Sequence, residues 1–226
     1  LSGKLEYSVG GGEWRAIESS DFDTYNTFWI SFGGSLGDLR LRGKSSIGTA
    51  EVGDVTTIEF WEQEHDVTCT GDIRTLIDWE NYETVSTSNA RFSHLFSDCS
   101  TLISAPNLPA TDLATYCYYC MFYNCSTLVD GPDELPATHL PKNCYDCMFY
   151  NCKKMENAPA MPTTPTTVES NCCSAMFGNC ISMTTGPSIL PATTLAESCY
   201  ARMFAYCTSL ATAPELPATT LAESCY

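Results

Sequence analysis

The chain has few basic residues, few histidines and no long apolar run. Only 11 lysines and arginines stand against 27 aspartates and glutamates, so the formal net charge is −16. A surface this acidic repels the phosphates of nucleic acids and of anionic lipids. No stretch approaches the roughly 18 consecutive apolar residues that a membrane-spanning helix requires. We therefore expect no nucleic acid as a partner and no membrane span in this chain.

Residue patterns that carry chemistry are also scarce. The three histidines, His65, His94 and His139, lie in unrelated contexts, and none stands beside a nucleophile motif such as G-x-S-x-G. Acidic side chains gather at residues 21–23 and 62–66, but neither segment matches the D-x-[DN]-x-[DN]-G loop that binds calcium. We therefore expect a non-enzymatic protein with no catalytic residues, no cofactor and no metal.

The chain nevertheless has ample material for a folded core. Apolar residues make up 44% of its 226 residues and aromatic residues 12%, whereas charged residues make up only 17%. This composition excludes a disordered chain, and the length suits one large domain or two ordinary ones.

An internal repeat of 26 to 28 residues dominates the second half of the sequence. In each repeat a Leu-Phe or Met-Phe pair is followed three residues later by a cysteine. The phenylalanines are Phe96, Phe122, Phe149, Phe177 and Phe204, and the cysteines are Cys99, Cys125, Cys152, Cys180 and Cys207. All length changes fall in the proline-rich stretch that ends each repeat, which is typical of an exposed loop. A fixed period of this length indicates a solenoid, in which each repeat buries its faces against its neighbours.

Local patterns within a repeat predict a strand and a helix. Residues 194–197 have the capping-box pattern, and Leu195, Cys199 and Met203 follow at positions i, i+4 and i+8. This spacing predicts a helix of about two and a half turns. Residues 210–213 are expected to form a short strand. The strand should end there, because the proline that follows lacks the N–H that a parallel ladder needs. The equivalent helices are expected to begin at Leu113, Leu140 and Val168.

The repeat resembles the BspA-like leucine-rich repeats of bacterial surface proteins, whose unit reads roughly L-x-x-I-x-x-x-A-F-x-x-C-x-x-L-x-x-I-x-L-P. The matching positions here are Leu195, Cys199, Met203, Phe204, Cys207, Leu210, Leu216 and Pro217. An Ala-Pro or Gly-Pro stands where that family has isoleucine in its strand. The resemblance implies an α+β leucine-rich-repeat solenoid over residues 87–226, with five repeats and the start of a sixth. It also implies a secreted or cell-surface bacterial protein that acts in adhesion.

Residues 1–86 differ in kind from the repeats. Residues 5–9 and 14–17 alternate apolar and polar side chains around a glycine triplet, which predicts a hairpin. Further strands are predicted at residues 28–32, 39–42, 56–61 and 66–70, whereas residues 72–78 fit a strand or a helix. Strands at this spacing predict a small β-sandwich, with an immunoglobulin-like fold as one option.

The two ends of the repeat array lead to different expectations. The first repeat has Thr87 and Arg91 where later repeats have apolar core residues, as expected where a stack ends. We expect the amino-terminal module to cover Phe92, Leu95 and Phe96. The last repeat begins like the others and has no polar cap, so we expect the parent protein to continue.

The 14 cysteines follow the repeat rather than a disulfide framework. Two C-x2-C pairs, at residues 117–120 and 144–147, are one repeat apart, and two other repeats have Ala175 and Arg202 in place of Cys120. A set of zinc ligands would not be diluted in this way. We favour columns of buried thiols, while disulfides between neighbouring repeats and a zinc site stay open as alternatives.

The repeat fixes the core positions, so recognition has to use residues that vary between repeats. The candidate partner-binding residues form an acidic to polar strip on the strand face: Asp130, Asp133, Glu134, Glu156, Asn157, Thr184, Thr212 and Glu215. We expect a monomer that binds an extracellular or cell-surface protein and whose signal peptide has been removed. The alternatives are a structural spacer and a glycan-binding protein, in which exposed rings among Trp14, Trp29, Trp61 and Trp79 stack on sugars. For these tryptophans a core position is favoured.

Overall fold

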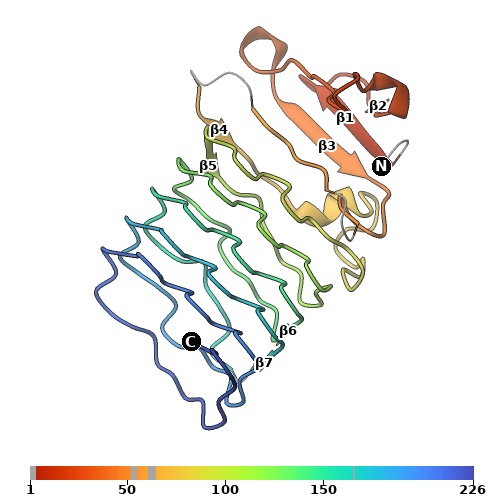
Figure 1. The fold of residues 1–226 in the computed structure, drawn as a ribbon. Coiled ribbons are helices and arrows are strands. Elements are labelled where there is room, and N and C mark those ends of the chain that lie inside the picture. Colours follow the sequence, from red (N-terminus) through yellow and green to blue (C-terminus); the bar gives the residue numbers. More distant parts are fainter. Residues whose placement is uncertain (1–3, 52–54, 61–64, 165) are drawn as a thin grey trace.

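The computed structural model describes residues 4–51, 55–60, 65–164 and 166–226 (Figure 1). Within these residues the regular elements are short, and none is an α-helix. The strands are β1 (Leu5–Val9), β2 (Arg15–Ala16), β3 (Leu39–Gly43), β4 (Val67–Thr68), β5 (Leu102–Ser104), β6 (His139–Leu140) and β7 (Thr167–Val168). The 3-10 helices are η1 (Ser19–Asp21), η2 (Gly34–Leu36) and η3 (Ile73–Leu76). No described helix has the length and apolar character needed to cross a membrane.

The expected fold class, an α+β leucine-rich-repeat solenoid behind a β-sandwich, is wrong. Most of the described chain is turn and irregular coil, and the strands form only three small sheets. No helix begins at Leu113, Leu140, Val168 or Leu195. Two of these residues, Leu140 and Val168, instead end β6 and β7, which pair in parallel. A repeat of strand, proline turn and helix is therefore not how this sequence folds.

The amino-terminal region forms one antiparallel sheet and not a sandwich. The predicted hairpin is confirmed, since β1 pairs with β2, and β3 lies on the other side of β1. Residues 28–32 contain no strand, and neither do residues 56–60, while Trp61 lies outside the described residues. The ambiguous segment at residues 72–78 contains η3, and β4 pairs in parallel with β5 of the first repeat.

Each segment that was expected to be a helix is a run of β-turns, which we call a turn ribbon. The turn ribbons are residues 92–99, 116–125, 143–152, 171–180 and 198–207. Alternate residues donate to the carbonyl three residues earlier, as Met121 does to Tyr118 at 3.1 Å. The residues between them donate to the next repeat, as Phe122 does to Met148 at 2.9 Å. An α-helix would instead direct every N–H to the carbonyl four residues earlier.

The backbone of a turn ribbon repeats every four residues. In the second ribbon Tyr116, Cys120 and Asn124 have φ of 61°, 52° and 60°, and the other ribbons follow the same pattern. A period of four brings positions i, i+4 and i+8 to the same face, so it produces the apolar stripe that predicted a helix. The left-handed positions distinguish a turn ribbon from an α-helix. Asparagine, which tolerates this conformation, is the next-to-last residue of three ribbons.

The repeats stack on one another (Figure 1), and matching side chains meet between them. The five phenylalanines of the repeat form one column with parallel rings, and successive ring centroids lie 5.4 to 5.8 Å apart. The leucine or methionine that follows each cysteine is fully buried in the first four repeats. This apolar column forms the core and keeps the repeats in register.

Described residues from the segments 44–51, 55–60 and 65–78 run along the first repeat and cover it. The N–H groups of Thr49 and Ala50 donate to Arg91 O at 2.9 and 3.2 Å, and that of Ile58 donates to Leu95 O at 2.7 Å. Phe92, Leu95 and Phe96 are at most 4% exposed. The expectation that the amino-terminal region covers this end of the stack is therefore confirmed.

Candidate binding surface

The predicted partner-binding residues lie on one exposed face of the stack. Parallel β-bridges join neighbouring repeats here in two rows. One row contains the bridges Ser104–Asp130 and Asn157–Thr185, and the other contains Glu134–Ala160 and Ile189–Glu215. The bridge Asp72–Asn107 extends the second row to the amino-terminal region. All eight predicted side chains are exposed. Because the bridges fix the backbone, these side chains stand at regular heights along the stack.

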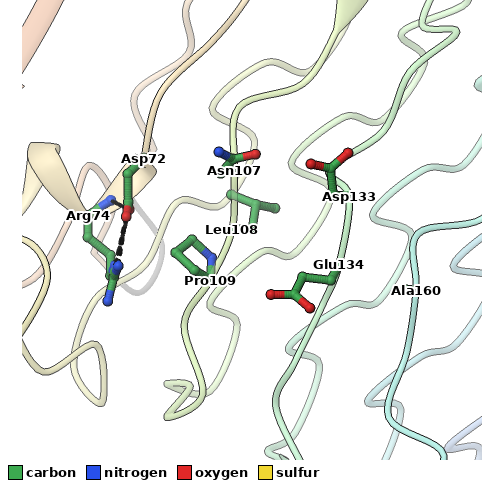
Figure 2. A pocket seen from close by; sticks show the side chains of 8 residues that line it. All are labelled: Asp72, Arg74, Asn107, Leu108, Pro109, Asp133, Glu134 and Ala160. Carbon is green, nitrogen blue, oxygen red and sulfur yellow. Dashed lines mark hydrogen bonds and ion pairs between the residues drawn. The ribbon is translucent and has the colours of Figure 1, made fainter.

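A groove of about 410 Å³ opens beside two of these residues, Asp133 and Glu134 (Figure 2). Its other lining residues are Asp72, Arg74, Asn107, Leu108, Pro109 and Ala160. In Figure 2 the Asp72–Arg74 pair faces Asp133 and Glu134 across Leu108 and Pro109. The remaining predicted residues lie outside the groove, so the structure brings only part of the predicted set together.

Asp72 fixes the cationic side chain of the groove. Its carboxylate accepts from Arg74 Nη2 at 2.7 Å and from the Arg74 backbone N–H at 2.9 Å, as the N-cap of η3. Arg74 Nη1 donates to the Glu83 carbonyl at 3.1 Å. The hydrogen bond that the guanidinium donates to Asp72 raises the pKa of Arg74, so this side chain stays charged and paired. Asp133 and Glu134 then leave the groove with a net negative charge.

Sequence reasoning missed Asp72 and Arg74 because they lie outside the repeats. The only local signal is the acidic N-cap before a short apolar run. This signal does not show which repeat the segment packs against. A second hollow, of about 260 Å³, shares Arg74 and Pro109 with the groove and includes Glu83 and Asp112. The acidic character therefore continues past the groove toward the first repeat.

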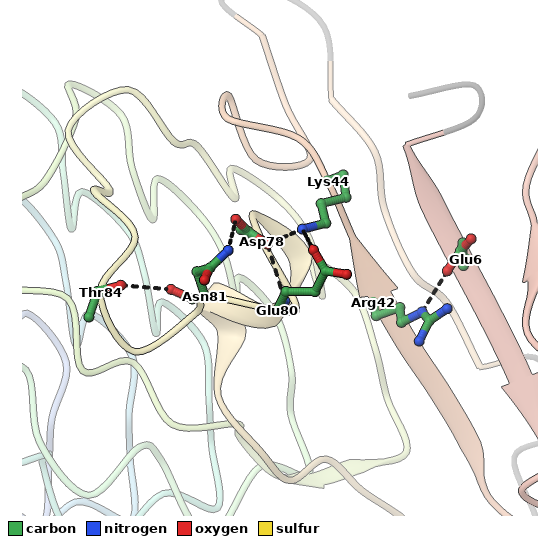
Figure 3. Close-up of polar contacts among 7 residues, drawn as sticks. All are labelled: Glu6, Arg42, Lys44, Asp78, Glu80, Asn81 and Thr84. Carbon is green, nitrogen blue, oxygen red and sulfur yellow. Dashed lines mark hydrogen bonds and ion pairs between the residues drawn. The ribbon is translucent and has the colours of Figure 1, made fainter.

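Two of the tryptophans hold an arginine between them. The guanidinium of Arg42 lies 4.1 Å from the ring centroid of Trp14 and 4.0 Å from that of Trp79, and its Nε is 2.5 Å from Glu6 Oε2 (Figure 3). One face of each ring is thus already occupied. Trp14 is 37% exposed and Trp29 is 60% exposed, so the favoured core position is wrong for both. Trp79 is half-buried, and Trp61 lies outside the described residues.

A second ion cluster lies beside this arginine. Lys44 Nζ pairs with Asp78 and, at 2.6 Å, with Glu80, while Asn81 donates to Asp78 at 3.0 Å (Figure 3). The hydrogen bond from Lys44 lowers the pKa of the Asp78 carboxyl to about 2. These contacts join β3 to the segment after η3, so they are contacts of the fold rather than a binding site.

The described part of the first acidic loop and two of the histidines make local contacts. Asp23 accepts from the backbone N–H groups of Tyr25 and Thr27, both at 2.9 Å, and so stabilises its own turn. Residues 62–64 of the second acidic segment lie outside the described residues. His94 packs edge-on against Tyr119, whereas His139 contacts Thr167 at 2.7 Å in another repeat. The described part of the chain holds no group of three or more His, Cys, Asp or Glu side chains that could bind a metal.

The cysteines form two long columns, and the prediction that most thiols are buried is confirmed. In the first column the thiols after Cys99 donate to a main-chain carbonyl of the preceding repeat, as Cys125 does to Phe96 at 2.9 Å and Cys180 to Phe149 at 3.1 Å. In the second column the thiols of Cys144, Cys172 and Cys199 donate to a carbonyl of the next repeat, at 3.6 to 3.7 Å. Cys173 occupies the position that the neighbouring repeats fill with a buried tyrosine.

No family model, no curated protein and no solved structure matches the chain. The resemblance to BspA-like repeats therefore stays a prediction from the sequence. Adhesion and secretion find no support in the structure or in these comparisons.

Proposed function

We propose that this chain is a non-enzymatic protein-interaction module whose acidic face binds a basic segment of another protein. The groove beside Asp133 and Glu134 supports the proposal, because its one cation, Arg74, is neutralised by Asp72. Asp130, Glu156 and Glu215 extend the negative charge along the bridged rows, and all three are exposed. The sequence leads us to expect that this binding takes place outside the cell.

The character of the face predicts the character of the binding. Exposed carboxylates at fixed heights attract lysine and arginine side chains over distances set by the ionic strength. Only Leu108, Pro109 and Ala160 offer apolar contact in the groove. We therefore expect modest affinity that falls steeply as salt is added.

A charge-reversal variant tests the proposal. Asp130, Asp133 and Glu156 are changed together to lysine, and binding of a fluorescent lysine- and arginine-rich peptide is measured by anisotropy between low and physiological salt. The control variant changes Glu13, Glu197 and Glu223 to lysine, which alters the net charge equally at exposed positions outside this face. We expect the first variant to lose at least tenfold in affinity and the control to lose much less. Equal losses would show attraction by net charge alone, and the proposal would then be wrong.

Neutral variants separate the groove from the rest of the face. The pair Asp133→Asn and Glu134→Gln removes the groove charges, and the pair Asp130→Asn and Glu156→Gln removes an equal charge outside it. If the groove is the centre of the interface, the first pair weakens peptide binding more than the second. The melting temperature should stay nearly constant in both, because the described contacts of these four side chains are with solvent rather than with the core.

A further inference from the structure

Cys120 and Cys147 stand outside the two long columns of cysteines. They occupy the same position in consecutive turn ribbons, with φ of 52° and 53°. The N–H of Cys120 donates to Asp146 O at 3.0 Å, so the two ribbons are in direct register at this point. The pKa of the Cys147 thiol is raised, and the neighbouring Cys120 thiol is the largest cause.

The distance between the two backbones suits a covalent bond. Neighbouring hydrogen-bonded chains lie about 4.8 Å apart. Disulfides usually join Cα atoms about 4.4 to 6.8 Å apart. Because both residues share one backbone conformation and one register position, their Cβ atoms leave the stack on the same side. A bond between them needs a rotation of the side chains and no shift of the ribbons.

Access also distinguishes this pair. Cys147 is only partly buried, whereas Cys120 behind it is 5% exposed. Most cysteines of the two long columns donate to main-chain carbonyls and are inaccessible to solvent. In the same row the other repeats carry His94, Ala175 and Arg202, so the described residues offer this row only one pair of facing thiols.

We propose that Cys120 and Cys147 form a disulfide that links the second and third repeats, made by exchange with a small-molecule disulfide such as oxidised glutathione. The thiolate of Cys147 attacks one glutathione sulfur, and the first glutathione leaves as a thiol. The thiolate of Cys120 then attacks the Cys147 sulfur, and the second glutathione leaves. The two cysteines lose two electrons and two protons, which end on the two glutathione thiols, so the step balances.

The bond would change the stack without changing its shape. It ties two adjacent repeats covalently, so the unfolded chain loses the freedom of the 26 residues between the cysteines. The oxidised protein should therefore melt at a higher temperature than the reduced protein, and a reductant should reverse the difference. This inference is independent of the acidic face and its partner.

The experiment uses the folded wild-type chain in buffers of oxidised and reduced glutathione at several ratios. Free thiols are blocked by alkylation under denaturing acid quench, and the remaining disulfide is mapped by mass spectrometry of proteolytic peptides. We expect one bond, between Cys120 and Cys147, with 12 of the 14 cysteines alkylated. The melting temperature should rise by several degrees as this bond forms.

Three variants sharpen the result. Cys147→Ser should form no bond and show no thermal shift, while Cys120→Ser should retain a mixed glutathione disulfide at Cys147. Cys69→Ala, which removes another partly buried thiol, should keep both the bond and the shift. A bond between other residues, such as Cys172 and Cys173, or 14 alkylated thiols at every ratio, would overturn the proposal. Mapping the wild-type chain decides this even if a variant fails to fold.

Discussion

The side-chain amide of Asn124 donates to the carboxylate of Asp98 across two repeats, at 2.8 Å from Nδ2 to Oδ1. The same contact continues up the stack, since Asn151 donates to Asn124, and Asn179 donates to Asn151 at 2.6 Å. Each asparagine is the next-to-last residue of its turn ribbon and has φ between 60° and 65°. These residues therefore stabilise the left-handed position and the contact between repeats at the same time, and Asp98 accepts at the end of the row.

Asn151 separates these two contributions. Asn151→Gly keeps the positive φ at little cost but loses the amide contacts, at about 1 kcal/mol for each hydrogen bond. Asn151→Ala also places a Cβ in the left-handed region, which costs roughly a further 1–2 kcal/mol. Urea unfolding should rank the wild type above the glycine variant and the glycine variant above the alanine variant. An alanine variant as stable as the glycine variant would contradict the role of the left-handed position.

Gly48 tests the contact between the amino-terminal region and the first repeat. A Cβ at Gly48 would lie 2.3 Å from Arg91 O, and its φ is +78°. Gly11 has a similar φ of +70°, with nothing within 4 Å of the added Cβ. Both alanine variants pay the left-handed strain, but only Gly48→Ala adds the clash, which overpacking data place at about 1–3 kcal/mol. Thermal unfolding should therefore show a larger loss of stability for Gly48→Ala than for Gly11→Ala. Equal losses would mean that the backbone at this junction moves away from the added Cβ with no loss of stability.

Arg42 should matter more than its exposed neighbour on β3. It lies between the rings of Trp14 and Trp79, and each cation–π contact is worth about 0.5–2 kcal/mol. Arg42→Met should lower the unfolding free energy and shift the tryptophan emission, and Arg42→Lys should restore only part of both, because lysine lacks the planar group that stacks. The control is Arg40→Met, which breaks an exposed ion pair with Asp38 and should change stability by less than about 1 kcal/mol. Similar effects of the two methionine variants would contradict this assignment.

The buried thiols should make the fold sensitive to alkali. Burial raises the pKa of the Cys99, Cys117 and Cys180 thiols to about 12 from an ordinary value of 9.0. The unfolded chain therefore releases these protons near pH 9, whereas the folded chain holds them until about pH 12. The stability is fully present below pH 9 and is lost as the pH rises toward 12, by about 1.4 kcal/mol per pH unit for each thiol.

Urea midpoints between pH 8 and pH 10.5 measure this loss. Cys117→Ala lowers the stability at every pH because it leaves a cavity, but it should also reduce the slope with pH by about one proton. A midpoint that stays constant over this range would show that the thiols ionise equally in both states.

The repeat and its columns could be predicted because identical residues recur where identical contacts recur. Phe122 and Cys125 are buried for the same reason as Phe149 and Cys152, and one period of the sequence shows it. The hairpin of β1 and β2 was also predictable, since its alternation and its glycine turn are local signals. The sequence could not predict which of the exposed residues face a groove, because the groove also needs Arg74 and Asp72 from outside the repeats.

The helix prediction was wrong for a definite physical reason. Leu195, Cys199 and Met203 are buried on one face, as predicted, but a four-residue turn cycle gives that face as well as a helix does. The asparagines at Asn151 and Asn179 were the available signal, because asparagine is weak in helix interiors and tolerates positive φ. The path of residues 44–51 and 55–60 along the first repeat had no such signal, since the hydrogen bonds of Thr49, Ala50 and Ile58 are long-range.

The peptide groups that link one turn ribbon to the next have dipoles aligned along the stack. The peptide group between Cys117 and Tyr118 accepts from Phe92 N–H and donates to Cys144 O, and equivalent groups continue this chain through every following repeat. In ordinary sheets neighbouring strand dipoles alternate and largely cancel. Here the intervening peptide groups close β-turns within their own ribbon, so the ribbon peptide groups that link repeats all point the same way, as they do in a helix. These rows of ribbon peptide groups are therefore polarised along the stack, with the positive pole toward the later repeats. Outside the ribbons some N–H groups donate to the earlier repeat, as Val129 does to Ile103. At the negative pole, Arg91 O and Leu95 O receive their hydrogen bonds from Thr49, Ala50 and Ile58.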